Sequence, residues 1–500
     1  YRLADHPWWA AVATLTSATV RMAVGATADM AAMGMDAAHS AMAARRALWT
    51  VVALAGAAFA FMEWVAVTQW LSGHWYLADV GNIHYCLFNT LHGSFMASPQ
   101  HDAINHFAFH FTPFLLLLLP LVPLSVYPVP LVTSYVLALA LCVPAVFALA
   151  RREGVDPWGG VALAWLFLAN HFVGSLELAN HFEVFYVLFI VLAMAARGTR
   201  WLFPLALLAM TVKEDAALWI AGWAAVECWL AGGASQRKRY AWLIAGALAC
   251  LAVAGATILI LQRIHGQGAM TEYGPRFRGM SFGFDSLLTF ALLLGSFALL
   301  PLLAGRRTVL ILLPAPVLLS NFPFMRHQLY YYSYPFLPFL ALTSCIGYVR
   351  LGDWLESRGR RTARRLLPVA LVLVGAAQWP LPTRTDGYHR LPFEVTARDR
   401  YRFDLARTVV PPDAPLALQF GLWGITPHRT GTHLLAPRTV RPADWVFMDL
   451  QSPHGLARED FITAARQVMG DVEAGRRRAL HSRYDIFIVS PVMAAQERKP

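Results

Sequence analysis

With 500 residues, 57% of them hydrophobic and only 14% charged, and a mean hydropathy of +0.47, the chain is too apolar for a soluble enzyme. The formal net charge of +11 does not indicate nucleic acid, because the arginines stand in pairs at the ends of apolar segments rather than along one polar face. The composition predicts a polytopic membrane protein whose basic residues set its orientation and contact anionic lipid.

The first 47 residues contain no basic stretch followed by a short apolar core, so no cleavable signal sequence is expected. Residues 1–47 are rich in alanine and methionine and are predicted to lie in the cytoplasm, along the membrane surface or against a partner. The cysteines show no CxxC spacing, which indicates neither a disulfide framework nor a zinc site. They are Cys86, Cys142, Cys228, Cys250 and Cys345.

Residues 48–381 are predicted to form a transmembrane domain, because a spanning helix needs roughly 20 mostly apolar residues and this range offers about eleven such windows. The run at 113–128 is short and contains four prolines, so it is expected to be re-entrant or juxtamembrane. The predicted fold class is therefore an α-helical polytopic membrane protein. Its predicted spans are residues 48–71, 130–150, 158–174, 183–196, 201–212, 216–231, 240–262, 284–304, 308–320, 334–349 and 366–381.

The arginine pairs predict the orientation of these spans, because cytoplasmic loops carry an excess of Lys and Arg. When Arg45 and Arg46 are placed inside and the run at 113–128 does not cross, every other arginine cluster also falls inside. The first external loop then covers residues 73–112. The external loops hold Asp79, His84, His92, His101, Asp102, His106, His110, Glu177, His181, Glu183, Lys213, Glu214, Asp215, Tyr273, Arg276, Arg278, Arg326, His327 and Gln328.

Three of these charged residues, Lys213, Glu214 and Asp215, directly follow an apolar run. Each ion placed at the middle of a bilayer would cost about 2.5 to 3.5 kcal/mol. They are therefore expected to lie at the interface, in a wet cavity or in ion pairs. A helix cap, in which the carboxylates face the positive end of the helix dipole, explains the same motif without a functional site.

Five segments occur in an order that resembles a known family. They are DVGNIHYCLFNTLHG (79–93), HFTPFLLLLLP (110–120), NHFEVFYVLF (180–189), KEDA (213–216) and HQLYYYSYPFLPFLAL (327–342). Together they resemble a family of bacterial polytopic membrane proteins that is grouped with the GT-C glycosyltransferase superfamily. The resemblance extends from about residue 50 to the C-terminus.

This resemblance implies a GT-C-like fold and transfer of a sugar from a polyprenyl-phosphate donor. GT-C enzymes carry a catalytic or metal-binding acidic residue in the first external loop, and Asp79 matches that residue by motif. The sequence departs from the family pattern at His84, where a second acidic residue is usual, and at Phe88, where tryptophan is usual. The departure puts a two-carboxylate metal site in doubt.

Glycosyl transfer requires a base for the acceptor hydroxyl and cations for the phosphate leaving group. Asp79 is the candidate base. The phosphate candidates are Arg276, Arg278, Arg326 and Lys213, and the last two are favoured because each abuts the end of a span. Binding of ordinary phospholipid headgroups explains the same arginines.

The remaining candidates concern metal and sugar binding. Asp79, His110 and Glu183 are weak candidates for a divalent ion, and no other cofactor is expected. His181 is a further substrate-site candidate, but on a helix it would point away from Glu183, two positions on. A bond from His110 to the backbone is an alternative. Tyr332, within a run of tyrosines, either stacks on a sugar or prenyl chain or belongs to the interfacial aromatic belt.

Residues 382–500 are more polar and predict a small extracytoplasmic α/β domain. Strand-like runs cover 414–421, 443–450 and 483–490, and a helical pattern covers 458–469. No phosphate-binding glycine motif accompanies them. By analogy with external domains of other GT-C proteins, this domain is expected to bind the acceptor or to act as a lid.

The expected function is transfer of a sugar from a polyprenyl phosphate to a cell-envelope acceptor, at the periplasmic face of the bacterial inner membrane. The expected partners are the lipid-linked sugar and membrane lipids, with no nucleic acid. Two alternatives remain. One is a non-catalytic subunit of a membrane assembly, consistent with His84 in place of an acid. The other is a lipid or solute transporter, although no pair of inverted halves is evident.

Overall fold

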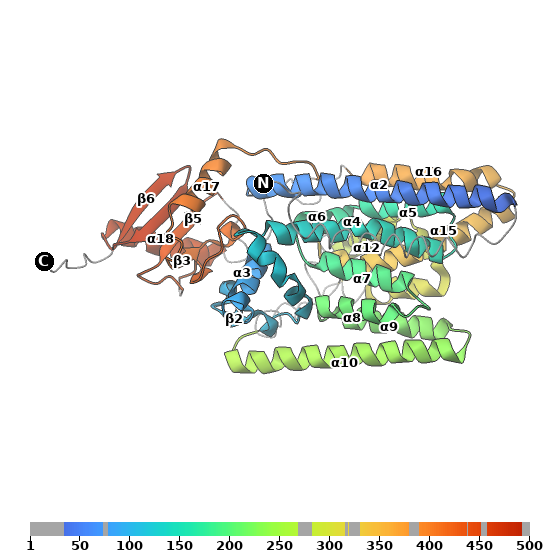
Figure 1. The fold of residues 1–500 in the computed structure, drawn as a ribbon, viewed down its shortest axis with the longest axis horizontal. Coiled ribbons are helices and arrows are strands. Elements are labelled where there is room, and N and C mark those ends of the chain that lie inside the picture. Colours follow the sequence, from blue (N-terminus) through green and yellow to red (C-terminus); the bar gives the residue numbers. More distant parts are fainter. Residues whose placement is uncertain are drawn as a thin grey trace.

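The computed structural model describes residues 35–73, 79–268, 283–315, 319, 331–379, 390–437, 439–451 and 458–492. An elongated bundle of helices makes up most of the molecule, and a small α/β domain lies at one end of it (Figure 1). The chain thus has the mostly helical membrane fold and the C-terminal sheet that the sequence predicts.

Four helical stretches are long and apolar enough to cross a membrane, among the described residues. They lie in α2 (Met35–Leu71), α4 (Val129–Arg152), α10 (Ala234–His265) and the stretch Tyr332–Ser357, which contains α15 (Leu337–Ser357). Two bent pairs bring the number to six if each pair is one span. They are α5 (Pro157–Ala169) with α6 (His171–Ala179), and α12 (Phe284–Ser296) with η6 (Leu300–Thr308) and α13 (Val309–Leu312).

The remaining helices of the bundle are shorter or more polar. They are α7 (Glu183–Ala195), α8 (Leu202–Val212), α9 (Ala216–Leu230) and α16 (Arg361–Gln378), with η7 (Tyr331–Phe336) leading into α15. The helix break between α5 and α6 occurs at Asn170, whose side chain accepts a hydrogen bond from the backbone N–H of Phe172. The finer prediction of about eleven spans stays a prediction.

The proline-containing run forms η4 (Pro113–Leu124), a 3₁₀-helix rather than an α-helix. Pro120 and Pro123 lie inside it, and a proline cannot donate a backbone hydrogen bond. At a rise of about 2.0 Å per residue, its 12 residues span about 24 Å, less than the roughly 30 Å of a hydrocarbon core. The segment is therefore short for a crossing and packs beside α3 (Asp79–Leu91), α4 and α8.

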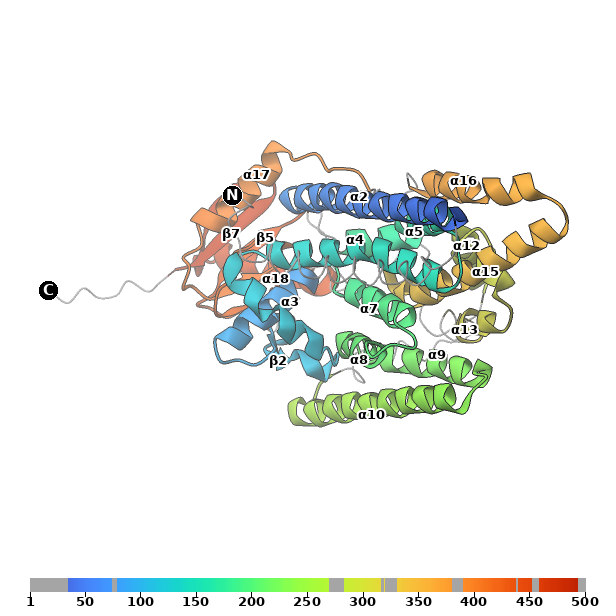
Figure 2. The same ribbon diagram turned by 45° about the vertical axis from the view of Figure 1, so that its right-hand side comes forward.

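The centre and the rim of the bundle differ in burial. Within their apolar windows, 83% of α4 and 78% of the stretch containing α15 are buried, against 28% of α2 and 17% of α10. Figures 1 and 2 both show α10 along the outside of the bundle, beside α9. Its outward side chains include Trp242 and Ile264, which are 63% and 68% exposed, as expected for a surface that faces lipid.

The charged groups lie at two opposite ends of the bundle. Arg152 ends α4, Arg197 follows α7 and Arg239 lies in the first turns of α10, and all three line one cavity. This basic end is separated from the start of α4 by 24 residues, or about 36 Å of helix. The other end, where α3 and the C-terminal domain lie, is called the loop end.

A short loop region precedes η4 at the loop end. It contains β1 (Ala97–Ser98), η2 (Pro99–His101), β2 (Ile104–Asn105) and η3 (His106–Ala108), with β1 and β2 paired antiparallel.

The C-terminal domain contains a mixed sheet in the order β4-β3-β5-β7-β6. Strand β3 pairs in parallel with β4 and β5, whereas β7 pairs antiparallel with β5 and β6. The elements are α17 (Ala397–Thr408), β3 (Leu416–Leu418), η8 (Phe420–Leu422), β4 (Thr432–Leu434), β5 (Trp445–Asp449), α18 (Arg458–Glu473), β6 (Arg477–Arg483) and β7 (Ile486–Pro491).

The predicted strand at 483–490 is wrong in its first residues. Tyr484 and Asp485 have φ angles of 58° and 59° and form the turn of the β6–β7 hairpin, because positive φ at both turn positions matches the twist of the flanking strands. The predicted strand therefore combines this turn with most of β7. The predicted helix at 458–469 lies within α18.

The C-terminal domain packs directly on α3 and on the end of α2. The Trp70 indole donates a hydrogen bond to the Gly424 carbonyl at 3.1 Å, and the Tyr85 hydroxyl donates to the Pro427 carbonyl at 3.1 Å. A Cβ placed on Gly81 would lie 2.6 Å from Trp423 Cβ and 2.7 Å from its backbone carbonyl carbon. Glycine at position 81 thus permits the close approach of α3 to the domain.

We expect Gly81→Ala to loosen this interface. The added methyl group meets backbone as well as side-chain atoms, so the domain must shift, at a cost of about 1 to 3 kcal/mol. Thermal unfolding and limited proteolysis of the purified protein should show a lower Tm and earlier cleavage in the C-terminal domain. Gly56→Ala is the control, because no atom lies within 4 Å of a Cβ at that helical position. Equal behaviour of the two variants would contradict close packing at Gly81.

Candidate functional site

Several charged side chains from distant parts of the sequence meet at the loop end. The most buried is Glu183, whose side chain has 0% exposure at the start of α7. One carboxylate oxygen accepts a hydrogen bond from Lys213 Nζ at 2.7 Å, and the other contacts His181 Nδ1. The negative charge therefore has partners on two sides and also lies at the positive end of a helix dipole.

The contact between His181 and Glu183 corrects the expectation that residues two positions apart would diverge. His181 precedes α7 instead of lying within it, and Asn180 has a left-handed backbone conformation with φ of 50°. The left-handed backbone at Asn180 places the His181 imidazole beside Glu183, the first residue of the helix. Because His181 is not in the helix, helical periodicity does not determine its direction.

On its other side, His181 faces Asp79. The distance from His181 Nε2 to Asp79 Oδ2 is 3.8 Å. The side chain of Asp79 is 29% exposed, whereas that of His181 is 10% exposed. A row of side chains therefore runs from half-buried Lys213 through Glu183 and His181 to the more accessible Asp79; we call these four residues the polar relay.

The protonation of His181 follows from its surroundings. Burial, together with the positive charge of Lys213, holds the pKa of His181 well below its ordinary value of 6.5. The neutral ring carries one N–H, and in the tautomer with the proton on Nδ1 this N–H faces the Glu183 carboxylate. The lone pair of Nε2 then points toward Asp79, which makes this nitrogen and this carboxylate a pair that can accept a proton.

The two acidic residues of the Lys213-Glu214-Asp215 (KED) motif form a second set of contacts. Glu214 accepts a hydrogen bond from His110 Nδ1 at 3.0 Å and from the backbone N–H of Phe111 at 3.1 Å. Asp215 accepts a hydrogen bond from the Tyr334 hydroxyl at 3.4 Å. Asp215 is the N-cap residue of α9, but its side chain makes no capping hydrogen bond, so tertiary contacts rather than a helix cap hold these carboxylates.

The KED carboxyl groups also differ in their affinity for protons. Burial alone would raise the pKa of Glu214, but the adjacent His110 and Lys213 bring it below its usual value. Burial raises the pKa of Asp215 to about 6, against the opposing effect of Lys213. Burial would lower the pKa of Lys213, yet nearby Tyr334, Asp215 and Glu214 raise it.

Two further histidines stand beside His110. His101 stacks on Phe109 with a ring-centre distance of 3.9 Å, and burial lowers its pKa to about 4. His106 is 6% exposed, and burial with the charge of His110 lowers its pKa to about 3. Both imidazoles are therefore neutral near pH 7.

The arrangement does not fit the expected divalent ion. Glu183 is engaged by Lys213 and His181, and His110 is engaged by Glu214. Within the ranges that the structure describes, no three His, Cys, Asp or Glu side chains are placed to hold a metal ion together. We therefore derive no catalytic step through a metal.

The other predicted binding residues have different positions. Tyr332 lies in the partly buried tyrosine segment and is close enough to Lys213 to raise its pKa. Arg276, Arg278 and Arg326 lie outside the described residues. Of the predicted site, the structure thus brings together Asp79, His110, His181, Glu183, Lys213 and Tyr332 at the loop end.

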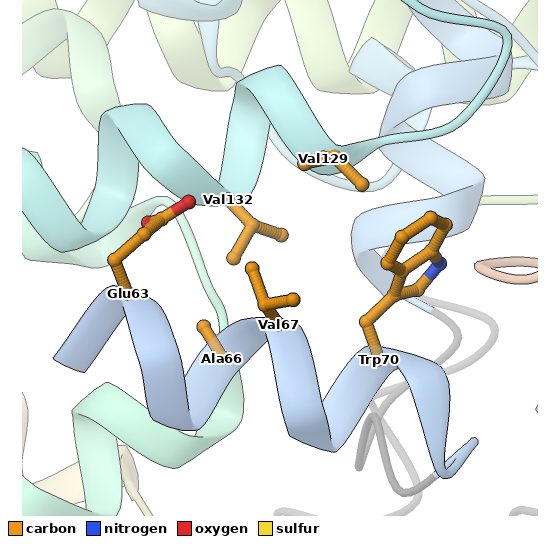
Figure 3. A pocket seen from close by; sticks show the side chains of 6 residues that line it. All are labelled: Glu63, Ala66, Val67, Trp70, Val129 and Val132. Atoms are coloured by element: carbon orange, nitrogen blue, oxygen red, sulfur yellow. The ribbon is translucent and has the colours of Figure 1, made fainter. Parts of the chain in front are cut away.

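Sequence reasoning missed Glu63, a carboxylate within the apolar stretch of α2. Figure 3 shows it at a narrow groove between α2 and α4 that is also lined by Val67, Trp70 and Val132. Its Oε1 accepts a hydrogen bond of 2.6 Å from the Thr133 hydroxyl. The available signal was an acidic residue inside an otherwise apolar window, since such residues are costly in a membrane and are usually paired.

Residues 79–381 match a protein-family model described as "Predicted membrane protein (DUF2079)". The chain belongs to the DUF2079 family. The match begins at Asp79 and includes the whole polar relay, whereas α2 and the C-terminal domain lie outside it. No curated protein matches the chain. The family description places this DUF2079 protein among membrane proteins and names no activity.

We expect Lys213→Met to destabilise the protein by about 3 to 5 kcal/mol, because it leaves the Glu183 carboxylate buried without its ammonium partner. Unfolding in detergent should show this loss. The double variant Lys213→Met with Glu183→Gln should recover part of it, since the unpaired charge is gone. Lys238→Met removes an exposed lysine at the basic end and should change little. Absence of recovery in the double variant would contradict this ion pair.

The raised pKa of Asp215 predicts that the stability of the folded protein depends on pH. Its folded-state pKa of about 6 lies above the ordinary value of 3.8, so the folded protein binds this proton more tightly than the unfolded chain. Its stabilising contribution is full below about pH 4 and is lost as the pH rises through about 6, by roughly 1 kcal/mol per pH unit. Unfolding of Asp215→Asn and the unmodified protein across pH 4 to 8 should give curves that diverge over this window. Parallel curves would disprove the raised pKa.

Proposed function

We propose that this DUF2079 protein is a GT-C-like glycosyltransferase that moves a sugar from a polyprenyl phosphate to a cell-envelope acceptor. The observation that supports the proposal most strongly is the polar relay, which ends in the partly exposed carboxylate of Asp79. Asp79 is the first residue of α3, in the loop where the resemblance to GT-C proteins places the functional acid.

In the proposed reaction, an acceptor hydroxyl approaches Asp79 and His181. Its oxygen attacks the anomeric carbon of the sugar while the bond from that carbon to the phosphate oxygen breaks. The hydroxyl proton passes to the Asp79–His181 pair, and the phosphate leaves with the bonding electrons. Glu183 fixes the orientation of the imidazole, and Lys213 keeps the charge of Glu183 balanced.

The surroundings suit a lipid-linked substrate. Next to α3 lies η4, whose Leu117 side chain is 62% exposed, so an apolar surface is available for a prenyl chain. Because Lys213 is paired with Glu183, we assign the proposed phosphate contacts to Arg276, Arg278 and Arg326. In this proposal, the loop end faces the periplasm and the C-terminal domain contributes to acceptor binding.

One observation favours a non-catalytic subunit as the second candidate. His84 replaces the second acidic residue of the family pattern, is 1% exposed and lies 3.3 Å from His428 of the C-terminal domain, measured from Nε2 to Nδ1. That position therefore packs the domain against α3. A chain that uses position 84 for packing and has lost the second acidic residue would be consistent with a non-catalytic subunit.

The first test is native mass spectrometry of gently purified protein, in which a retained prenyl phosphate, with or without a sugar, is the expected result. We then expect Asp79→Asn to retain the lipid but to lower the rate of sugar transfer by about 10²- to 10⁴-fold, because it removes the base. The assay follows loss of the sugar from the retained lipid in the presence of cell-envelope acceptors.

Asp102→Asn is the matched control. It removes a carboxylate of the same loop that is 69% exposed, is not one of the polar relay residues and lies 4.0 Å from the exposed Arg441 of the C-terminal domain. Its activity should equal that of the unmodified protein. Undiminished transfer by Asp79→Asn would refute the proposed base, and a stoichiometric protein partner with phospholipid alone would favour the subunit.

A further inference from the structure

A second polar site lies at the basic end of the bundle, remote from Asp79. It is a cavity of about 470 Å³ between the ends of α4, α7, α9, α10 and η6. Its charged lining residues are Arg151, Arg152, Arg197, Arg239, Arg307 and Glu227. The volume lies within the range of small-ligand pockets, about 300 to 1,000 Å³, and far exceeds the roughly 30 Å³ of one water molecule.

Two of the arginines are held by carboxylates. Glu227 accepts hydrogen bonds from Arg307 Nε at 2.7 Å and Arg307 Nη2 at 2.9 Å, and from Arg197 Nη1 at 3.3 Å. Arg197 also contacts Glu153 and is only 8% exposed. This buried network forms a fixed wall on one side of the cavity.

Two other arginines, Arg152 and Arg239, approach the same residue, Gly198. A Cβ on Gly198, which has a φ of +81°, would lie 3.0 Å from Arg152 Nη2 and 3.9 Å from Arg239 Nη1. Both guanidinium groups therefore reach the same side of Gly198. In the part of the chain that the structure describes, neither has a carboxylate within ion-pair distance. Convergent positive charge beside a cavity is stabilised when an anion occupies the cavity.

We propose that this cavity binds a phosphate group, held by Arg152 and Arg239. A guanidinium donates two parallel hydrogen bonds, a geometry that matches phosphate oxygens. The cavity lies where apolar helices end, at the level of lipid headgroups if the bundle crosses a membrane. The phosphate belongs either to an anionic phospholipid or to a soluble phosphate compound, and the two sources are separable by experiment.

The test uses the full chain in nanodiscs of phosphatidylcholine, which has no net charge. Two probes are measured: inorganic pyrophosphate by isothermal titration calorimetry, and phosphatidylglycerol, added as a minor lipid, by native mass spectrometry. We expect at least one probe to bind, and the double variant Arg152→Gln with Arg239→Gln to weaken it at least about tenfold. Pyrophosphate binding assigns a soluble ligand, and retention of phosphatidylglycerol alone assigns a lipid.

The control is the double variant Arg360→Gln with Arg361→Gln, which removes two exposed arginines near the start of α16, outside the cavity. It should bind the same probe within about twofold of the unmodified protein. If the first double variant fails to fold, Arg152→Gln alone, at an exposed residue, carries the test. Binding of neither probe, or an equal loss in the control, overturns the proposal.

Discussion

Compensation of buried charge is the constraint on which the loop end depends. Glu183 has no exposed side-chain surface, and a carboxylate in such a place is tolerated only when other groups neutralise it and satisfy its oxygens. Lys213 supplies the opposite charge, and His181 occupies the second oxygen. These contacts connect α7, the turn before it and the turn between α8 and α9. Asp79 remains at the margin, where its carboxylate can meet both the imidazole and solvent.

The same constraint operates at the basic end, where a second buried carboxylate is neutralised by arginines instead of lysine. There Glu227 is the shared acceptor, and it joins α9 to the segment after α7 and to η6. Arginine is suited to this use because its planar guanidinium can engage a carboxylate through two donors at once. The two ends therefore differ in charge: carboxylates dominate the loop end, and arginines outnumber the carboxylates at the basic end.

The separation of charges between the two ends was predictable from the sequence, because arginine pairs alternate with acidic and histidine-containing loops along the chain. Several members of the site were predictable as well, since charged residues beside apolar runs are conspicuous. Their pairings were not. The contact of His181 with Glu183 depends on the reversed backbone at Asn180, and the role of Lys213 depends on a partner 30 residues away. The β6–β7 turn was missed because Tyr484 and Asp485 lack the glycine that usually marks it.

The close packing of α3 on the C-terminal domain restricts how this protein can move. Gly81 touches the Trp423 backbone only two residues after Asp79, and Tyr85 is bonded to the same domain one helical turn later. These contacts fix the N-terminal half of α3 to the domain. A shift of the domain against the bundle would therefore also change the distance between the Asp79 carboxylate, at the start of this helix, and His181.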